Sequence, residues 1–308
     1  MGKSSFQIFC LILVSTLMCT IFTGCYDIRE VDDLAYVMGI GFDKGKTNLV
    51  KMTLQIAVPL AVGSGNEGGG EGNKSVIVTT IEAPSIFSGL NMTNNYLSKQ
   101  LDLSHAKVVV FSEELAKEGI QKYINALKRF RGVRGNAYVA VSRGSAEEYM
   151  RSVKPLLEVN PAKFYELNFT SYKYTSFTAG TKLPDFYLQQ TSSGSQPVVT
   201  LASTGKYESS KEFDLEGSTS REKNRDIPLE GDFKAGYIPR IGDLKSEIMG
   251  VAVFDGAKMI GELDGGETTN YLIINGKFKS FYYTLQDPLY DKMYVVLNIS
   301  SGRDPAIK

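Results

Sequence analysis

The first 25 residues place the tightest limit on what this chain can become. One positive charge, Lys3, precedes an uncharged apolar run from Phe6 to Phe22. A short basic start, an apolar middle and small residues at the end are typical of a secretory signal. The run falls short of the roughly 20 apolar residues that a membrane-spanning helix needs. We therefore expect residues 1–24 to be a signal peptide, and an uncut membrane helix is the alternative.

The end of that run carries a second pattern. Residues 22–25 read FTGC, which resembles the lipobox of bacterial lipoproteins, usually Leu-(Ala/Ser)-(Gly/Ala)-Cys. The resemblance implies cleavage before Cys25 and a diacylglyceryl thioether on its thiol, with a further N-acyl chain left open. Because one acyl chain alone binds a membrane only marginally, two chains would hold the protein without a spanning helix. Myristoylation of Gly2 is excluded, since Phe6 stands where that motif requires Ser or Thr.

The cysteines and the charges fit an exported protein. All three cysteines, Cys10, Cys19 and Cys25, lie in this first segment, so a mature chain keeps only the lipidated one. Such a chain folds without a disulfide and lacks the usual ligands of a structural zinc site. We expect no metal and no cofactor. The 34 basic and 34 acidic residues balance, which argues against a nucleic-acid partner because such partners favour a basic surplus.

Hydrophobic spacing in the first half of the chain alternates between strand and helix patterns. Ser112 and Ser145 each stand just before acidic residues and a helical pattern, which is typical of a helix N-cap. Interleaved strands and helices indicate an α+β fold, in which helices pack on a mixed sheet over residues 25–195. Strands are expected at 34–41, 48–59, 75–81, 106–111 and 137–142, and helices at 84–99 and 120–130.

The second half predicts further domains. Residues 63–74 are glycine-rich and residues 209–233 are polar, so we expect a loop and an exposed linker there. Residues 196–290 are expected to form a second, smaller α+β domain, and 291–308 the start of a third domain that is mostly missing. An apolar strand at 294–299 would then lack partners. Strands are expected at 246–254 and 258–263, joined by an Asp-Gly turn, and at 276–285 and 292–300, with a helix at 265–275.

Patterns that would carry chemistry are weak. The G-x-G-x-x-G at 63–68 is not followed by a helix, so it does not indicate nucleotide binding. The single histidine, His105, has no hydrolase motif beside it and is interpreted as structural. Tyr165, Phe169 and Tyr172 have the spacing of one helix face, which predicts core packing. No catalytic residue is predicted.

One basic run leaves two interpretations open. Residues 128–134 read KRFRGVR. A solvated helix end is favoured, because cations suit a helix C-terminus. The alternative is contact with anionic lipid head groups, to which each basic residue adds about 1 kcal/mol.

Three ordered segments resemble a known family. Residues 24–35 (GCYDIREVDDLA) are similar to the start of the Ger(x)C family, the lipoprotein C subunits of spore germinant receptors, and Gly41-Phe42-Asp43 takes the place of that family's Gly-Ile-Asp. Residues 103–112 (LSHAKVVVFS) resemble its S-H-x-K strand. Residues 250–268, with GVAVF, MIGEL and ET, resemble its G-x-A-V-F…L-V-G-x-L…E-T segment.

The resemblance implies a function. The protein would be a lipid-anchored, non-catalytic subunit of a nutrient receptor, on the outer face of the inner spore membrane beside two integral-membrane subunits of A and B type. Its role would be assembly and signalling in germination. A solute-binding lipoprotein of a transporter is the alternative, since that class also is exported and anchored. A cell-wall enzyme that uses His105 is a third reading.

Overall fold

The computed structural model divides the chain into two compact units, Met1–Leu34 and Ala35–Lys308. It describes residues 2–21, 30–46, 49–58, 75–130, 132–154, 157–158, 160–205, 228–240, 242–287, 289–290 and 293–300. The first unit contains helix α1 (Lys3–Ile21) and a 3₁₀ turn, η1 (Val31–Asp33). Over the described ranges, no helix combines the length and apolar character that crossing a bilayer requires.

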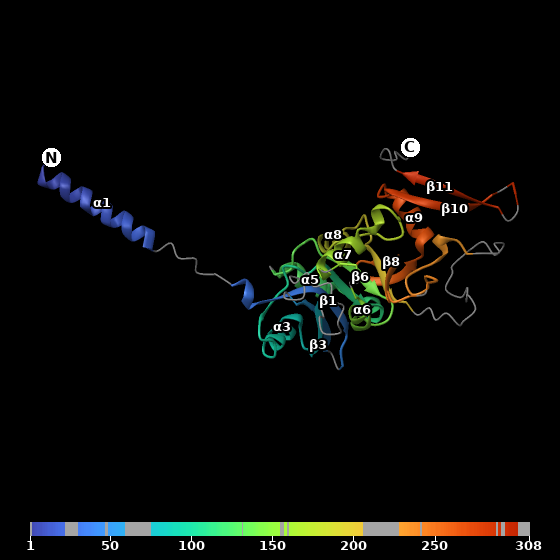
Figure 1. Ribbon diagram of the computed structural model, residues 1–308, viewed down its shortest axis with the longest axis horizontal. Helices are drawn as coiled ribbons and strands as arrows, with labels where there is room; N and C mark the ends of the chain where they lie inside the picture. The colour runs from blue at the N-terminus through green and yellow to red at the C-terminus, as the bar shows by residue number, and fades with distance from the viewer. Residues whose placement is uncertain are drawn as a thin grey trace. The chain divides into compact units, whose positions relative to one another are not determined.

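The second unit is built on one mixed sheet, which has nine strands within the described residues. Their order is β3-β2-β1-β5-β6-β7-β8-β9, and β4 also pairs with β1. The central strands β1, β5, β6 and β7 are parallel, and antiparallel strands flank them on both sides (Figure 1). The strands are β1 (Leu34–Lys44), β2 (Val50–Ala57), β3 (Val76–Ala83), β4 (Gln100–Asp102), β5 (Val108–Ser112), β6 (Tyr138–Ser142), β7 (Val198–Thr204), β8 (Ser246–Asp255) and β9 (Lys258–Leu263).

Helices cover both faces of this sheet, which is why the central strands read as unbroken apolar runs. Every residue of β5 and of β6 is buried. The helices are α3 (Ile86–Asn94), α4 (Glu113–Glu118), α5 (Gln121–Arg129), α6 (Ala146–Ser152), α7 (Pro161–Phe169) and α8 (Leu183–Thr191), with a 3₁₀ turn η2 (Ser171–Lys173) after α7.

Each face has its own hydrophobic core. On one face, α3, α4, α5 and α8 pack on side chains such as Phe42, Phe111 and Phe254. On the other face, α6 and α7 pack on Val108, Val110 and their neighbours. The stripe predicted to be core contributes Tyr165 and Phe169, both fully buried in the second core, so that prediction is confirmed for these two residues.

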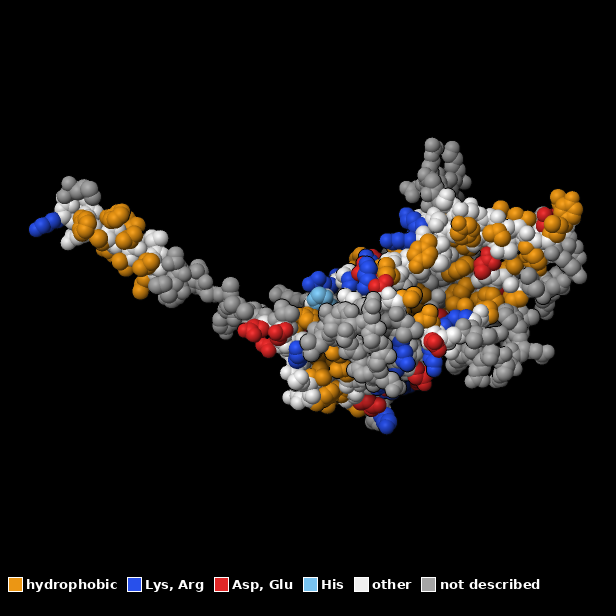
Figure 2. Space-filling view, viewed as in Figure 1, with side chains coloured by type: hydrophobic (Ala, Val, Ile, Leu, Met, Phe, Trp, Pro, Cys, Tyr) orange, Lys and Arg blue, Asp and Glu red, His pale blue; other side chains and the backbone are white. Residues whose placement is uncertain are grey.

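A small element follows the main sheet. Helix α9 (Gly265–Ile274) precedes a two-stranded antiparallel sheet of β10 (Ser280–Gln286) and β11 (Tyr294–Ser300). A third cluster around Leu272, Phe278 and Phe281 joins the helix to the hairpin. Hydrophobic side chains remain exposed along this hairpin, as the orange groups over β10 and β11 show (Figure 2), among them Tyr282, Val296 and Leu297.

The α+β class predicted from the sequence is confirmed. The predicted hairpin at β8–β9 is present, and the strands expected at 34–41 and 48–59 pair with each other as β1 and β2. Ser112 and Ser145 cap α4 and α6 as expected. The helix expected over 84–99 ends at Asn94, and a short strand, β4, follows it. Strand β7 lies beyond the boundary predicted at 195–196, yet it pairs with β6 before that boundary. The loop 63–74 and most of the linker 209–233 fall outside the described residues.

Candidate functional site

The predicted lipidation site, Cys25, lies outside the described residues. Its assignment therefore remains a prediction from the sequence. The structure describes residues 30–35 of the first segment that resembles the Ger(x)C family, and it describes the other two segments. Gly41–Asp43 and residues 108–112 lie in the parallel strands β1 and β5.

Gly41, Phe42 and Asp43 end β1, and each has a separate structural task. A Cβ at Gly41 would lie 3.1 Å from Met150 Cγ and 3.4 Å from Ala146 Cβ, so glycine lets α6 approach this face closely. Phe42 points to the other face, where its ring stacks on Phe111 with centroids 5.4 Å apart. Gly41 therefore packs against α6 on one face of the sheet, and Phe42 packs in the hydrophobic core on the other face.

Asp43 fixes the start of α6. Its carboxylate oxygens accept hydrogen bonds from the backbone N–H of Ala146 at 2.8 Å and of Glu147 at 2.9 Å. Asp43 is buried, and a negative charge at the N-terminus of a helix is stabilised by the helix dipole and by the free N–H groups there. Ser145 adds a local cap by accepting from Glu148 N–H at 3.4 Å. Asp43 on β1 thus caps α6, a helix that follows β6 in the sequence.

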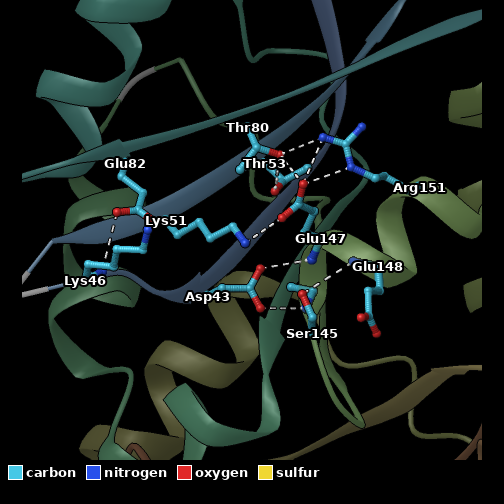
Figure 3. A network of polar contacts seen from close by, with 11 residues as sticks. Asp43, Lys46, Lys51, Thr53, Thr80, Glu82, Ser145, Glu147, Glu148 and Arg151 are labelled. Carbon is cyan, nitrogen blue, oxygen red and sulfur yellow. Dashed lines mark hydrogen bonds and ion pairs between the residues drawn. The ribbon is translucent and has the colours of Figure 1, made fainter.

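Glu147 is the centre of a polar network beside that cap. Its carboxylate lies 2.5 Å from Lys51 Nζ and 2.8 Å from Arg151 Nη2, and it accepts a hydrogen bond from Thr80 Oγ1 at 3.0 Å. In Figure 3 these three side chains converge on Glu147 from β2, α6 and β3, while Asp43 points toward the first residues of α6. The hydrogen bond from Lys51 is the largest cause that lowers the pKa of Glu147 to about 2, against the opposing effect of burial. Glu147 therefore stays ionised at physiological pH.

A second charged cluster lies near the carboxyl end of β6, between β6 and β9. Arg143, directly after β6, donates to Ala235 O at 3.0 Å, and its guanidinium lies 4.7 Å from the centre of the Tyr237 ring. Its Nε is 3.4 Å from Glu262 on β9, whose other oxygen accepts from Lys234 at 2.9 Å. These contacts hold the chain that returns at residues 228–240 against β6 and β9.

Glu247 on β8 closes this cluster. Its side chain is only 4% exposed, and its carboxylate accepts from Arg240 Nε at 2.8 Å and from the backbone N–H of Gly236. A charge this deeply buried is tolerated because it is paired and hydrogen-bonded. The cluster joins residues 234–240 to the sheet by ion pairs and hydrogen bonds.

The segment around His105 forms the turn that leads into β5. Asp102 accepts from Ser104 N–H at 2.7 Å, and Lys107 N–H donates to Met38 O at 2.8 Å. The exposed His105 ring lies edge-on to Tyr36 with centroids 5.0 Å apart. Lys107 thus ties the start of β5 to β1, and the structural role of His105 stays a prediction from the sequence.

These side chains can position elements, and each carboxylate is engaged by protein donors. Among the described residues, no group of three or more His, Cys, Asp or Glu side chains is placed to hold a metal ion. The sequence patterns gave no signal for Lys51, Arg143 or Glu262, because their partners come from distant parts of the chain. The Ser145 cap predicted that a helix begins near Glu147, but it gave no indication of the ion pairs that Glu147 forms.

Comparison with known proteins defines the class. The family model described as "Spore germination protein N-terminal domain" matches residues 27–204, and the model "Spore germination B3/ GerAC like, C-terminal" matches residues 249–308. Since the first match alone covers more than half of the chain, the chain belongs to this family of spore germination proteins. The Ger(x)C family recognised from the sequence is confirmed.

The chain is similar to three curated members of this family. "Spore germination protein KC" of Bacillus subtilis is 33% identical over 170 residues, which is 54% of this chain and 42% of the relative. "Putative spore germination protein YfkR" of the same organism is 30% identical over 137 residues, 44% of this chain and 36% of the relative. "Spore germination protein GerQC" of Bacillus cereus is 23% identical over 285 residues, 91% of this chain and 65% of the relative. The chain thus spans between about a third and two thirds of the length of these relatives.

Proposed function

We propose that this chain is the lipid-anchored, non-catalytic subunit of a nutrient receptor that acts in spore germination. Membership in the spore germination family is the observation that carries the proposal. The secretory signal and the Gly24-Cys25 pair support export and lipid attachment at Cys25. The protein would lie on the outer face of the inner spore membrane and work with integral-membrane subunits of A and B type.

The geometry of the strand ends supports a role in assembly. Asp43 and Glu147 are held by backbone N–H groups and cations of the same fold. Strand ends that are tied to α6 by these contacts suit a subunit that holds partners in a fixed arrangement. The side chains at this edge have the roles of positioning residues.

Replacement of Cys25 by Ala tests the anchor and the function together. Spores that carry Cys25→Ala as their sole copy are followed by loss of optical density after nutrient and after a trigger that bypasses nutrient receptors. We expect loss of the nutrient response alone, together with loss of lipid label from the protein. Cys19→Ala is the matched control, because it removes a thiol inside the predicted signal and leaves the lipidation site intact.

Three results would contradict the proposal in different ways. Retained lipid label in Cys25→Ala would overturn the anchor site. A normal nutrient response despite lost label, in a strain without related receptor genes, would overturn the requirement for anchoring in receptor function. Loss of both responses would place the protein after the receptor step.

A further inference from the structure

Helix α3 exposes aromatic and apolar side chains beside the C-terminus of α5. Phe87 and Met92 on α3 are each 44% exposed, although α3 buries Ile86 and Leu90 in the core below. Phe87 contacts Phe130, the C-cap residue of α5, with ring centroids 5.4 Å apart. We name the exposed part of these two helices and of the chain after α5 the α3–α5 surface.

The charge of this surface is one-sided. The chain as a whole has 34 basic and 34 acidic residues, but residues 83–101 and 119–134 contain no Asp or Glu. The second of these segments carries five basic residues, Lys122, Lys128, Arg129, Arg131 and Arg134. Lys128, Arg129 and Arg134 are exposed, and no carboxylate within the described part of the chain forms a salt bridge with them. Their charges are free for an external anion.

Acidic residues on α7, α8 and β4 are engaged by other groups. Glu166 on α7 pairs with Lys107 at 3.2 Å and Lys163 at 3.6 Å. Asp185 in the first turn of α8 accepts from Lys182 N–H, and Asp102 accepts from Ser104 N–H. None of these carboxylates forms an ion pair with a cation of the α3–α5 surface.

The basic segment lies at the amino ends of the parallel strands, where β1 begins. Residues 128–134 connect α5 to the amino end of β6, and the amino ends of β1, β5 and β6 share one edge because these strands are parallel. β1 begins at Leu34, nine residues after Cys25 (34 − 25 = 9). Nine extended residues span at most about 30 Å. A lipid on Cys25 keeps this edge within that distance of a bilayer.

We propose that the α3–α5 surface rests on an anionic phospholipid membrane. Lys128, Arg129 and Arg134 contact lipid phosphates, and Phe87 and Phe130 lie at the level of the head groups. Phenylalanine beside basic residues suits this interfacial region, and each basic residue strengthens binding to an anionic leaflet roughly fivefold. The inference rests on the membrane location proposed above and adds the surface that faces the lipid.

A single tryptophan reports this contact in the full chain. The protein contains no tryptophan, so Phe87→Trp introduces one fluorophore on the α3–α5 surface. The variant is reconstituted with vesicles of phosphatidylcholine alone and with vesicles that also contain phosphatidylglycerol. We expect a blue shift and quenching by brominated lipid only in the anionic vesicles. Tyr174→Trp, at a residue that is 60% exposed outside this surface, is the control and should show neither change.

Charge reversal tests the cations. Lys128→Glu/Arg129→Glu/Arg134→Glu in the Phe87→Trp chain should lower the preference for anionic vesicles by at least about hundredfold, because three fivefold contributions are lost and three repulsive charges are added. Lys258→Glu/Lys277→Glu/Lys279→Glu changes the net charge equally at exposed lysines elsewhere and should change the preference less than about twofold.

Flotation of the vesicles separates this inference from the anchor. A Phe87→Trp chain that floats with both vesicle types but shows the same tryptophan emission in each is anchored and does not rest on the α3–α5 surface, which overturns the inference. Unchanged emission after the triple reversal at residues 128, 129 and 134 overturns it as well. A chain that floats with neither vesicle type contradicts the anchor and the docking surface together.

Discussion

Asp43 at the end of β1 and Ala146 at the start of α6 are joined by a hydrogen bond of 2.8 Å across 103 residues of sequence. A helix cap usually comes from the residue next to the helix. Here a strand two positions away in the sheet supplies it, so one carboxylate ties the start of α6 to β1.

We expect Asp43→Ala to lower the free energy of unfolding by about 2–3 kcal/mol, because it leaves two N–H groups near the helix start without an acceptor. Asp43→Asn should cost less, about 1–2 kcal/mol, since one acceptor oxygen remains. Chemical denaturation measures both. Asp255→Asn is the control, because Asp255 is exposed in the β8–β9 turn, and equal effects at both positions would contradict the capping role.

The low pKa of Glu147 predicts a stability that depends on pH. The pKa of a free glutamate is near 4.5 and that of Glu147 is about 2, so the unfolded chain binds the proton more readily. The stabilisation is complete above pH 4.5 and is lost as the pH falls toward 2. Between pH 7 and pH 3 the wild type should lose about 1–2 kcal/mol more than Glu147→Gln. Equal pH profiles of urea unfolding for the two proteins would contradict this assignment.

Gly250 on β8 is required by its backbone. Its φ is +80°, and an added Cβ would lie 2.4 Å from the carbonyl oxygen of Leu263. We expect Gly250→Ala to destabilise the protein by more than about 2 kcal/mol. Gly261 on the paired strand β9 has no atom within 4 Å of an added Cβ. Gly261→Ala should therefore unfold at nearly the wild-type temperature in calorimetry, and a similar loss in both variants would contradict the steric reason.

Glu262 neutralises two cations, so its removal should cost more than that of an exposed glutamate. Glu262→Gln leaves Arg143 and Lys234 without a countercharge in a site where their side chains are only 20% and 18% exposed. We expect a loss of about 1–3 kcal/mol and partial recovery when Lys234→Met is added. Glu114→Gln removes a partner of Lys44 at a side chain that is 68% exposed, and it should cost less than about 1 kcal/mol. Denaturant midpoints compare the four proteins.

Local patterns predicted much of this fold. Ser112 and Ser145 were identified as caps because a cap depends on residues within one turn. The Asp255-Gly256 turn predicted the β8–β9 hairpin for the same reason. β4 was missed because a strand of three residues has too short a pattern to distinguish it from a loop.

The polar networks could not be predicted in this way. Glu147 contacts Lys51 and Thr80 only because β2, β3 and α6 come together in space. Arg143 contacts Glu262 because β9 pairs with β8 in the antiparallel hairpin at that side of the sheet. Hydrophobic periodicity gives the buried face of each element but not which elements are neighbours. The Gly41-Phe42-Asp43 segment was recognised by resemblance, and its three tasks required the structure.

The placement of β1 inside the sheet has a mechanical consequence. β1 is the first strand of the second unit, and it pairs along one side with β2 over seven residue pairs and along the other with β5 over four. Tension applied along the chain from residue 25 would act along β1 and load both ladders of hydrogen bonds in shear. They would have to break together, whereas an edge strand could peel away one bond at a time. A protein held by its N-terminus at such a strand can bear a pull between a membrane and a bound partner without first losing its outer strands.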